Sequence, residues 1–215
     1  MTRCIVFSHL GPINQLAWSH PSSGDLLASV GQDGMLRVWK EVQQNHWQCV
    51  YRHQAQSALR AVQFAPAEYG IMLTTGGLDG KVTVVSYLPA KQAWTDPFEL
   101  QAHDRSINGI SWAPAVKPCL LKAERVDLAS EVEQAPEVAV QRFTTCGNDG
   151  RVKVWAQDVN SGELECVANL GVGEEQQGKT AHDDQVNDVA WRSYSGSLAD
   201  MIVSLGADQR VRIWK

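Results

Sequence analysis

The sequence predicts an all-β protein made of β-propeller blades, and three observations lead to this prediction. A histidine is followed by an aspartate four times, and an apolar residue, tryptophan in three cases, comes six residues after each aspartate. Each aspartate also has a serine or threonine four residues before it. Repeats of about this length and punctuation are typical of propeller blades. The four sets are His9, Ser29, Asp33 and Trp39; His53, Thr75, Asp79 and Val85; His103, Thr145, Asp149 and Trp155; and His182, Ser204, Asp208 and Trp214.

Each repeat should contain three clear strands and a weaker fourth. A first strand starts soon after each histidine and ends in an aromatic residue, and a second runs into the aspartate. Asp-Gly is favoured in tight hairpins that need a positive φ, so a third strand should follow at once. The weaker fourth strand carries Trp47 or Trp94. The expected ranges are 13–18, 59–64, 107–112 and 186–191 for the first strand; 26–30, 71–75, 143–146 and 201–205 for the second; and 36–39, 82–85, 152–155 and 211–214 for the third.

The polar residues of each set have a structural explanation. Neighbouring blades cover both faces of a blade, and a buried carboxylate must be hydrogen-bonded. The aspartate can accept from the histidine, whose other ring nitrogen can reach the Ser/Thr hydroxyl. That hydroxyl can in turn accept from the tryptophan Nε1–H. We therefore expect structural tetrads in three repeats, while the second, with Val85 in place of tryptophan, should end at Thr75.

Composition limits the function classes. The chain has 215 residues, 44% of them hydrophobic, which is enough for one sizeable core, and we expect a single domain over 1–215. A net charge of −5 argues against nucleic acid as a main partner. The chain shows no long apolar run that could span a membrane, and residues 1–8 are too short and polar for a signal peptide. Five scattered cysteines without a C-x-x-C pair predict a reducing compartment and no metal site.

Two segments interrupt the repeats at 9–39, 53–85, 103–155 and 182–214. Residues 117–141 lengthen the third repeat and should form an exposed loop insertion. The second segment contains G-x-x-x-x-G-K-[ST] at 173–180, the pattern of a nucleotide-binding loop. That loop works between a strand and a helix, whereas a strand follows here, and Glu174 and Glu175 would repel phosphate. We expect a solvated loop, and no catalytic, cofactor-binding or metal site anywhere. Trp47 and Trp94 could serve either outer-strand packing or partner contact.

The tetrad is the mark of WD-repeat propellers, and further segments resemble one family within them. These are 13–21, 64–70, 110–116 and 186–191, Trp39-Lys40-Glu41 followed by Trp47, and a long insertion directly after 113–116. In this order they resemble the WD-repeat subunit shared by the COPII vesicle outer coat and the nuclear pore Y-complex. The resemblance implies a six-bladed open ring, of which this chain would cover the second to fifth blades. It would begin in an outer strand at 4–7 and end before the outer strand of its last blade, so we expect a longer natural protein.

The resemblance also implies a function. It predicts a non-catalytic scaffold without cofactors that supports ER-to-Golgi transport and nuclear pore architecture. Its partner would be a coat or nucleoporin α-solenoid that supplies strands to complete the propeller, with no nucleic acid, membrane insertion or small-molecule substrate. Its place would be the cytoplasmic face of the endoplasmic reticulum, COPII vesicles and the nuclear pore. The alternatives are a WD-repeat adaptor that presents a peptide-binding surface for signalling or ubiquitin transfer, the related small propeller of the Y-complex, and a nucleotide hydrolase based on 173–180.

Overall fold

The computed structural model describes residues 9–115, 140–158, 161–171, 180–192 and 201–215. Their regular elements are antiparallel strands and two short 3-10 helices, η1 (Pro21–Ser23) and η2 (Ala67–Tyr69). This confirms the all-β prediction. The expected outer strand at 4–7, residues 117–139 of the insertion and residues 173–179 of the glycine-containing pattern lie outside the described part of the chain.

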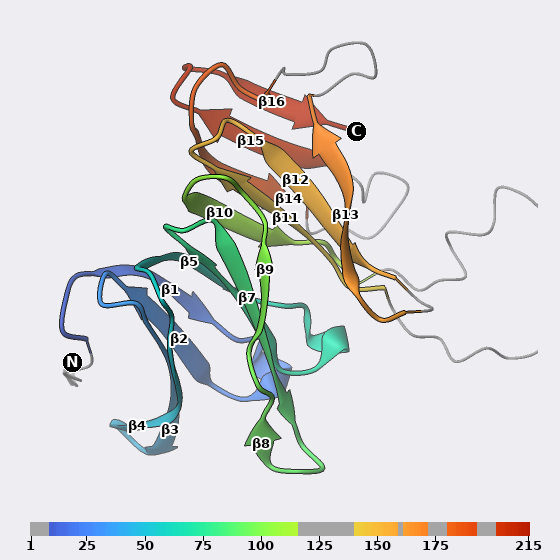
Figure 1. Cartoon of the computed structure of the whole chain (residues 1–215). Coiled ribbons are helices and arrows are strands. Elements are labelled where there is room, and N and C mark those ends of the chain that lie inside the picture. The colour runs from blue at the N-terminus through green and yellow to red at the C-terminus, as the bar shows by residue number, and fades with distance from the viewer. Residues whose placement is uncertain (1–8, 116–139, 159–160, 172–179, 193–200) are drawn as a thin grey trace, which may run out of the picture.

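The strands form four sheets that follow one another along the chain (Figure 1). In each sheet the strand order is the chain order, as expected for blades built from consecutive hairpins. The blades are β1 (Ile13–Trp18), β2 (Leu26–Gly31), β3 (Met35–Gln43) and β4 (His46–Gln54); β5 (Leu59–Phe64), β6 (Met72–Gly77), β7 (Lys81–Leu88), β8 (Ala93–Trp94) and β9 (Phe98–Gln101); β10 (Ile107–Trp112), β11 (Arg142–Gly147), β12 (Val152–Gln157) and β13 (Leu164–Leu170); and β14 (Val186–Trp191), β15 (Ile202–Gly206) and β16 (Val211–Trp214).

The fourth strands differ from the expectation of a uniformly weak element. In the first blade β4 is nine residues long and pairs along β3, so it is not weaker than the others. In the second blade the outer strand is divided, because β8 pairs with the end of β7 and β9 with its beginning. The described part of the last blade has three strands.

The core lies between blades rather than inside one. One cluster joins the first two blades through residues such as Val38 and Leu59. A second joins the next pair through Val82 and Phe143, and a third continues to the last blade. The sheets succeed one another as in a propeller, and the ring they form is open (Figure 1). Each blade therefore depends on its neighbours to bury both of its faces.

The turns between second and third strands share one conformation. In the third blade Gly150 N–H donates to the Gly147 carbonyl at 3.2 Å, and Gly150 has a φ of +73°. A turn closed in this way and followed by a residue of positive φ is a common hairpin connection. The residue after the aspartate has positive φ in every blade, and in the last blade it is Gln209, with a φ of +63°.

A β-bulge lies near the start of each inner strand, and in the first three blades it directs a polar residue across the blade boundary. The pairing register shifts at the second residue of β1, β5, β10 and β14, which are Asn14, Arg60, Asn108 and Asn187. Bulges of this kind re-aim a side chain. Asn14 Nδ2 donates to the Leu59 carbonyl of the next blade at 2.6 Å, and Asn108 Nδ2 donates to the Val186 carbonyl at 2.7 Å. These contacts tie consecutive blades together near the axis.

Candidate functional site

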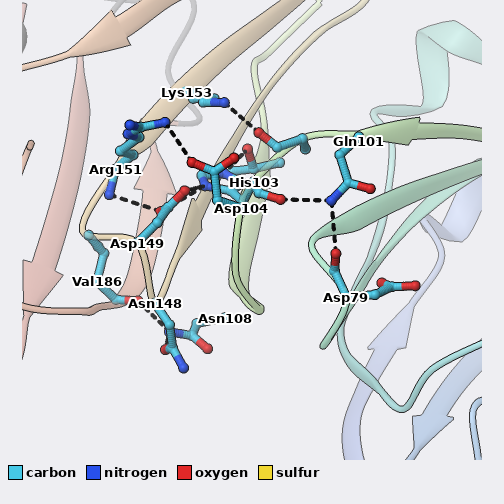
Figure 2. A network of polar contacts seen from close by, with 12 residues as sticks. Asp79, Gln101, His103, Asp104, Asn108, Asn148, Asp149, Arg151, Lys153 and Val186 are labelled. Carbon is cyan, nitrogen blue, oxygen red and sulfur yellow. Dashed lines mark hydrogen bonds and ion pairs between the residues drawn. The ribbon is translucent and has the colours of Figure 1, made fainter.

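The third blade contains the most deeply buried of the predicted polar sets, and Figure 2 shows two of its members, His103 and Asp149. His103 comes from the loop before β10, Thr145 from β11, Asp149 from the following turn and Trp155 from β12. His103 Nδ1 lies 2.9 Å from both carboxylate oxygens of Asp149, and its Nε2 lies 2.8 Å from Thr145 Oγ1. Trp155 Nε1–H donates to the same hydroxyl oxygen at 2.9 Å. A neutral histidine that donates from Nδ1 and accepts at Nε2 satisfies all four groups.

The environment of Asp149 keeps the carboxylate charged. Burial by itself would raise its pKa, but the hydrogen bond from His103, with backbone N–H donors from Arg151 and Asp104, holds the pKa below its usual value. Arg151 also pairs through its guanidinium with Asp104 at 3.1 Å (Figure 2). Several strands and one loop therefore meet at a single carboxylate.

The first and last blades repeat this geometry. His9 and His182 each place Nδ1 2.9 Å from the aspartate of their set, Asp33 and Asp208, and Nε2 2.8 Å from the serine hydroxyl. Tryptophan completes both sets: Trp39 donates to Ser29 at 3.1 Å, and Trp214 donates to Ser204 at 3.0 Å.

The second set is not assembled as the sequence suggested. His53 lies on β4, and among the described residues its Nε2 has no hydrogen-bond partner; Glu99 lies 3.9 Å from it. The position four residues before the inner strand, which His103 and His182 occupy in their blades, is held here by Ala55. Its N–H donates to the Gly34 carbonyl just as His103 and His182 donate to Gly80 and Gly150. His53 is therefore displaced by two residues and cannot reach Asp79.

Other groups surround Asp79 instead. The Lys81 N–H donates to Asp79 Oδ1 at 3.1 Å, and Ser57 Oγ accepts from the Asp79 N–H at 3.4 Å. Thr75 is fully buried and no described residue hydrogen-bonds to its Oγ1. The prediction that the network ends at Thr75 is therefore wrong. Without the histidine and the tryptophan, the Thr75 hydroxyl has no hydrogen bond to any described residue. Val85 fills the tryptophan position and packs in the core between the first two blades.

Four glycines that make room for the hydrogen-bonded sets were not predicted from the sequence. A glycine precedes each aspartate by two residues: Gly31, Gly77, Gly147 and Gly206. A Cβ at Gly206 would lie 2.4 Å from His182 Nδ1 and 2.6 Å from Asp208 Oδ1, so a larger residue would push into the hydrogen bond. The signal was present in the sequence as a fixed Gly-x-Asp spacing in all four repeats.

Trp47 and Trp94, the two tryptophans considered for partner contact, are half-buried and contact other aromatic rings. Trp47 meets Trp18 edge to face, with ring centroids 5.7 Å apart. Trp94 packs on Tyr51 and Tyr87 at 4.8 and 5.6 Å and lies against the core between the first two blades.

The described residues contain no group of histidine, cysteine, aspartate and glutamate side chains placed to hold a metal ion. Within the same residues, no helix has the length and apolar character needed to cross a membrane. Thr180, the last residue of the 173–180 pattern, lies in the described part and donates its hydroxyl to the His182 carbonyl.

Comparison with known proteins gives consistent results. The family model for the WD domain, G-beta repeat, matches residues 2–40 and 173–215. The SEC13 homolog of Drosophila melanogaster is 33% identical over 211 residues, which cover 96% of this chain and 53% of that protein. The protein transport protein SEC13-2 of Candida glabrata is 34% identical, and the sec13 protein of Emericella nidulans is 31% identical; each alignment covers 96% of this chain and 62% of the relative. The chain thus spans between about half and two thirds of the length of these relatives.

Proposed function

This chain is a WD-repeat, Sec13-like propeller that spans part of the length of its relatives, and we propose that it acts as a non-catalytic scaffold of a protein-transport coat. In this proposal it supports ER-to-Golgi vesicle budding and nuclear pore architecture. It binds an α-solenoid protein that contributes strands to the propeller, and it works at the cytoplasmic face of the endoplasmic reticulum and at the nuclear pore. The names of the relatives, which describe protein transport, support the first part.

The observation that carries the proposal is apolar surface at the two outer faces of the blade series. Leu16 pairs with Ser29 on β2 and is 57% exposed, whereas Val62, Ile110 and Val189 at the same position are between 2% and 8% exposed. On the last blade Val211 and Ile213 are 68% and 63% exposed, against 0% and 7% for Val152 and Val154. Apolar surface of this kind marks a protein interaction site. Further strands would bury it.

The cavity where the inner strands begin gives no support to a peptide adaptor that binds at the centre of the ring. A circle of basic or aromatic side chains where the inner strands begin would favour that function. The cavity at that place, about 430 Å³ in volume, is lined instead by side-chain amides, one arginine and one aspartate: Asn14, Gln15, Arg60, Asn108, Asn148, Gln185, Asn187 and Asp188. The similarity to SEC13 proteins over 96% of the chain favours the coat subunit over the other small propeller of the Y-complex.

Purification of the natural protein with an affinity tag tests the proposal. We expect a large α-helical coat or nucleoporin subunit to co-purify in stoichiometric amount, and a fluorescent fusion to mark ER exit sites and the nuclear rim. Recovery without such a subunit, together with diffuse fluorescence, would contradict the scaffold function.

A further inference from the structure

A groove between the outer parts of the first two blades is not used by the tetrads or by the open faces of the ring. Its volume is about 270 Å³, and its walls include Leu26, Lys40, Val50, Ile71, Tyr87 and Trp94. Both blades that form it have their inner and outer strands in the described residues, so the groove is complete without any further blade. Its apolar side rests on the core between these blades, to which Leu26 belongs and against which Ile71 packs.

Aromatic rings form one side of the groove. Trp94 lies on β8, which caps a hairpin that extends from the second blade (Figure 1). Tyr51 of the first blade packs on the Trp94 ring with an interplanar angle of 32°, and Tyr87 meets it at 62°. Trp94 is thus held between two rings from different blades. Opposite, Val50 remains 40% exposed. Fixed aromatic rings beside an open apolar pocket are typical of sites where a partner inserts an anchor side chain.

The groove carries a single positive charge. Lys40 is the one charged residue among its walls, and no described carboxylate lies within ion-pair distance of its ammonium group. Its cross-strand neighbour on β4 is the neutral Gln48. An occupant with an acidic group beside an apolar one would therefore complement both the charge and the apolar surface.

We propose that this groove is a docking site for a short extended segment of a partner protein, with one apolar anchor residue directly followed by acidic residues. The volume lies just below the range of about 300–1,000 Å³ of small-molecule sites, so it suits one or two side chains rather than a cofactor. The anchor lies against Trp94, Ile71 and Val50, and the carboxylate pairs with Lys40. The site does not depend on the scaffold function proposed above.

Fluorescence anisotropy with the natural protein tests the site. The probe is a fluorescein-labelled peptide Gly-Ser-Leu-Asp-Asp-Ser-Gly, compared with a Leu-Lys-Lys version and with a Gly-Asp-Asp version that lacks the anchor. We expect saturable binding of the first peptide and much weaker binding of the other two. Lys40→Glu should weaken binding at least about fivefold, because an attraction becomes a repulsion. Trp94→Phe, which keeps an aromatic ring in the core, should also weaken it.

Two matched variants control for general effects. Lys91→Glu reverses a charge in the β7–β8 hairpin outside the groove, and Trp47→Phe alters a half-buried tryptophan that does not line the groove; neither should change the affinity. Equal binding of the acidic and basic peptides, or unchanged affinity in both Lys40→Glu and Trp94→Phe, would overturn the proposal. So would a Lys40→Glu chain that binds the peptide normally but sediments differently, because the groove would then be a contact between copies of this chain.

Discussion

The aspartate of each complete set accepts hydrogen bonds from an imidazole and from backbone N–H groups of two different segments. Asp33, for example, accepts from His9, from Leu10 N–H at 2.9 Å and from Met35 N–H at 3.1 Å. The incoming loop, the turn and the third strand are thereby held to one carboxylate. These residues are well placed to stabilise the fold, and their regular recurrence gives no reason to assign them a chemical role.

Replacement of these aspartates should have unequal costs. Asp149→Ala leaves the buried His103 without its acceptor and should lower the free energy of unfolding by about 1–3 kcal/mol. Asp79→Ala should cost less, because no histidine reaches Asp79, and within the described residues its carboxylate accepts from the Lys81 N–H. Thermal melts of both variants in the natural protein measure this. Equal losses, or a larger loss for Asp79→Ala, would contradict a stabilising role of the tetrads.

The same carboxylate predicts a pH dependence. The folded-state pKa of Asp149 is lowered, so its contribution to stability is complete above the usual carboxyl pKa of about 3.9 and is lost as the pH falls through the lower folded value. The difference in melting temperature between the natural protein and Asp149→Asn should therefore be largest near neutral pH and shrink below pH 4. A difference that stays constant down to pH 2 would show that the charge of Asp149 contributes nothing.

Gln209 offers a stabilising substitution. It occupies the positive-φ turn position that Gly34, Gly80 and Gly150 fill in the other blades. Side chains with a Cβ are disfavoured there by roughly 1–2 kcal/mol, part of which the greater chain entropy of glycine offsets. Gln209→Gly should therefore raise the melting temperature. As a control, Gln48→Gly in the middle of β4 should lower it. If both variants melt lower than the parent, the strain at Gln209 is not significant.

Lys179 is the lysine of the nucleotide-loop pattern at 173–180, for which we expect no nucleotide binding. The pattern at 173–180 is followed by β14 rather than by the helix that a phosphate-binding loop requires. Lys179→Ala should leave binding of a fluorescent ATP analogue unchanged, at the level of no specific binding. Saturable micromolar binding that disappears in this variant would reverse that interpretation.

Among the strands, the bulged inner elements determine how blades are joined. Asn108 is the centre of this system, because it accepts from Arg60 at 3.0 Å and donates to Asn148 at 2.6 Å and to the Val186 carbonyl (Figure 2). It therefore connects the second, third and fourth blades. Gln15 and Ser111 make similar contacts between neighbours by accepting from the backbone of Val62 and Trp191.

The equivalent bulge position in the last blade provides a control for the hydrogen bonds of Asn108, which we call the Asn108 clamp. Asn108→Ala removes two hydrogen bonds across blade boundaries and one within the third blade, and it should destabilise the protein by about 1–3 kcal/mol. Asn187→Ala changes the equivalent bulge of the last blade, where the side chain is exposed and no hydrogen bond to a described residue is seen, and should cost less than about 0.5 kcal/mol. Chemical denaturation of both variants decides the point. Similar losses at the two positions would mean that the clamp has no special effect.

For the molecule as a whole, the exposed faces of the first and last blades dominate the expected behaviour. Trp18 is 60% exposed on β1, whereas Trp112 and Trp191 at the same position are buried. Exposed apolar sheet and open strand edges template association with other chains. The two outer faces therefore resemble protein interfaces that further strands or a partner would cover.

We predict that the 215-residue chain alone is not a stable monomer. Its two outer faces should drive self-association unless further blades or a partner cover them, because a propeller normally leaves only short, protected edges. Light scattering on the purified chain measures this directly. A monodisperse monomer with a sharp melting transition would show that four repeats are sufficient.

The sequence alone determined the repeat, the strand positions and three of the four hydrogen-bonded sets. It could do so because a side-chain tetrad requires fixed spacing within each hairpin, and this spacing is local. The strands at 13–18, 107–112 and 186–191 accordingly match β1, β10 and β14. The Gly-x-Asp glycines belong to the same local information and could have been read in advance.

The tertiary structure was needed for every feature that depends on contacts between blades, because the segments that link the blades differ in length. It showed that Ala55, not His53, holds the histidine position, because that position is set by the distance to β5 and by the carbonyl of Gly34, not by the histidine itself. It also revealed the bulge contacts of Asn108 and the groove at Trp94, which arise where two blades meet. Packing between blades joins residues with no fixed sequence separation, so no repeat pattern could have predicted it.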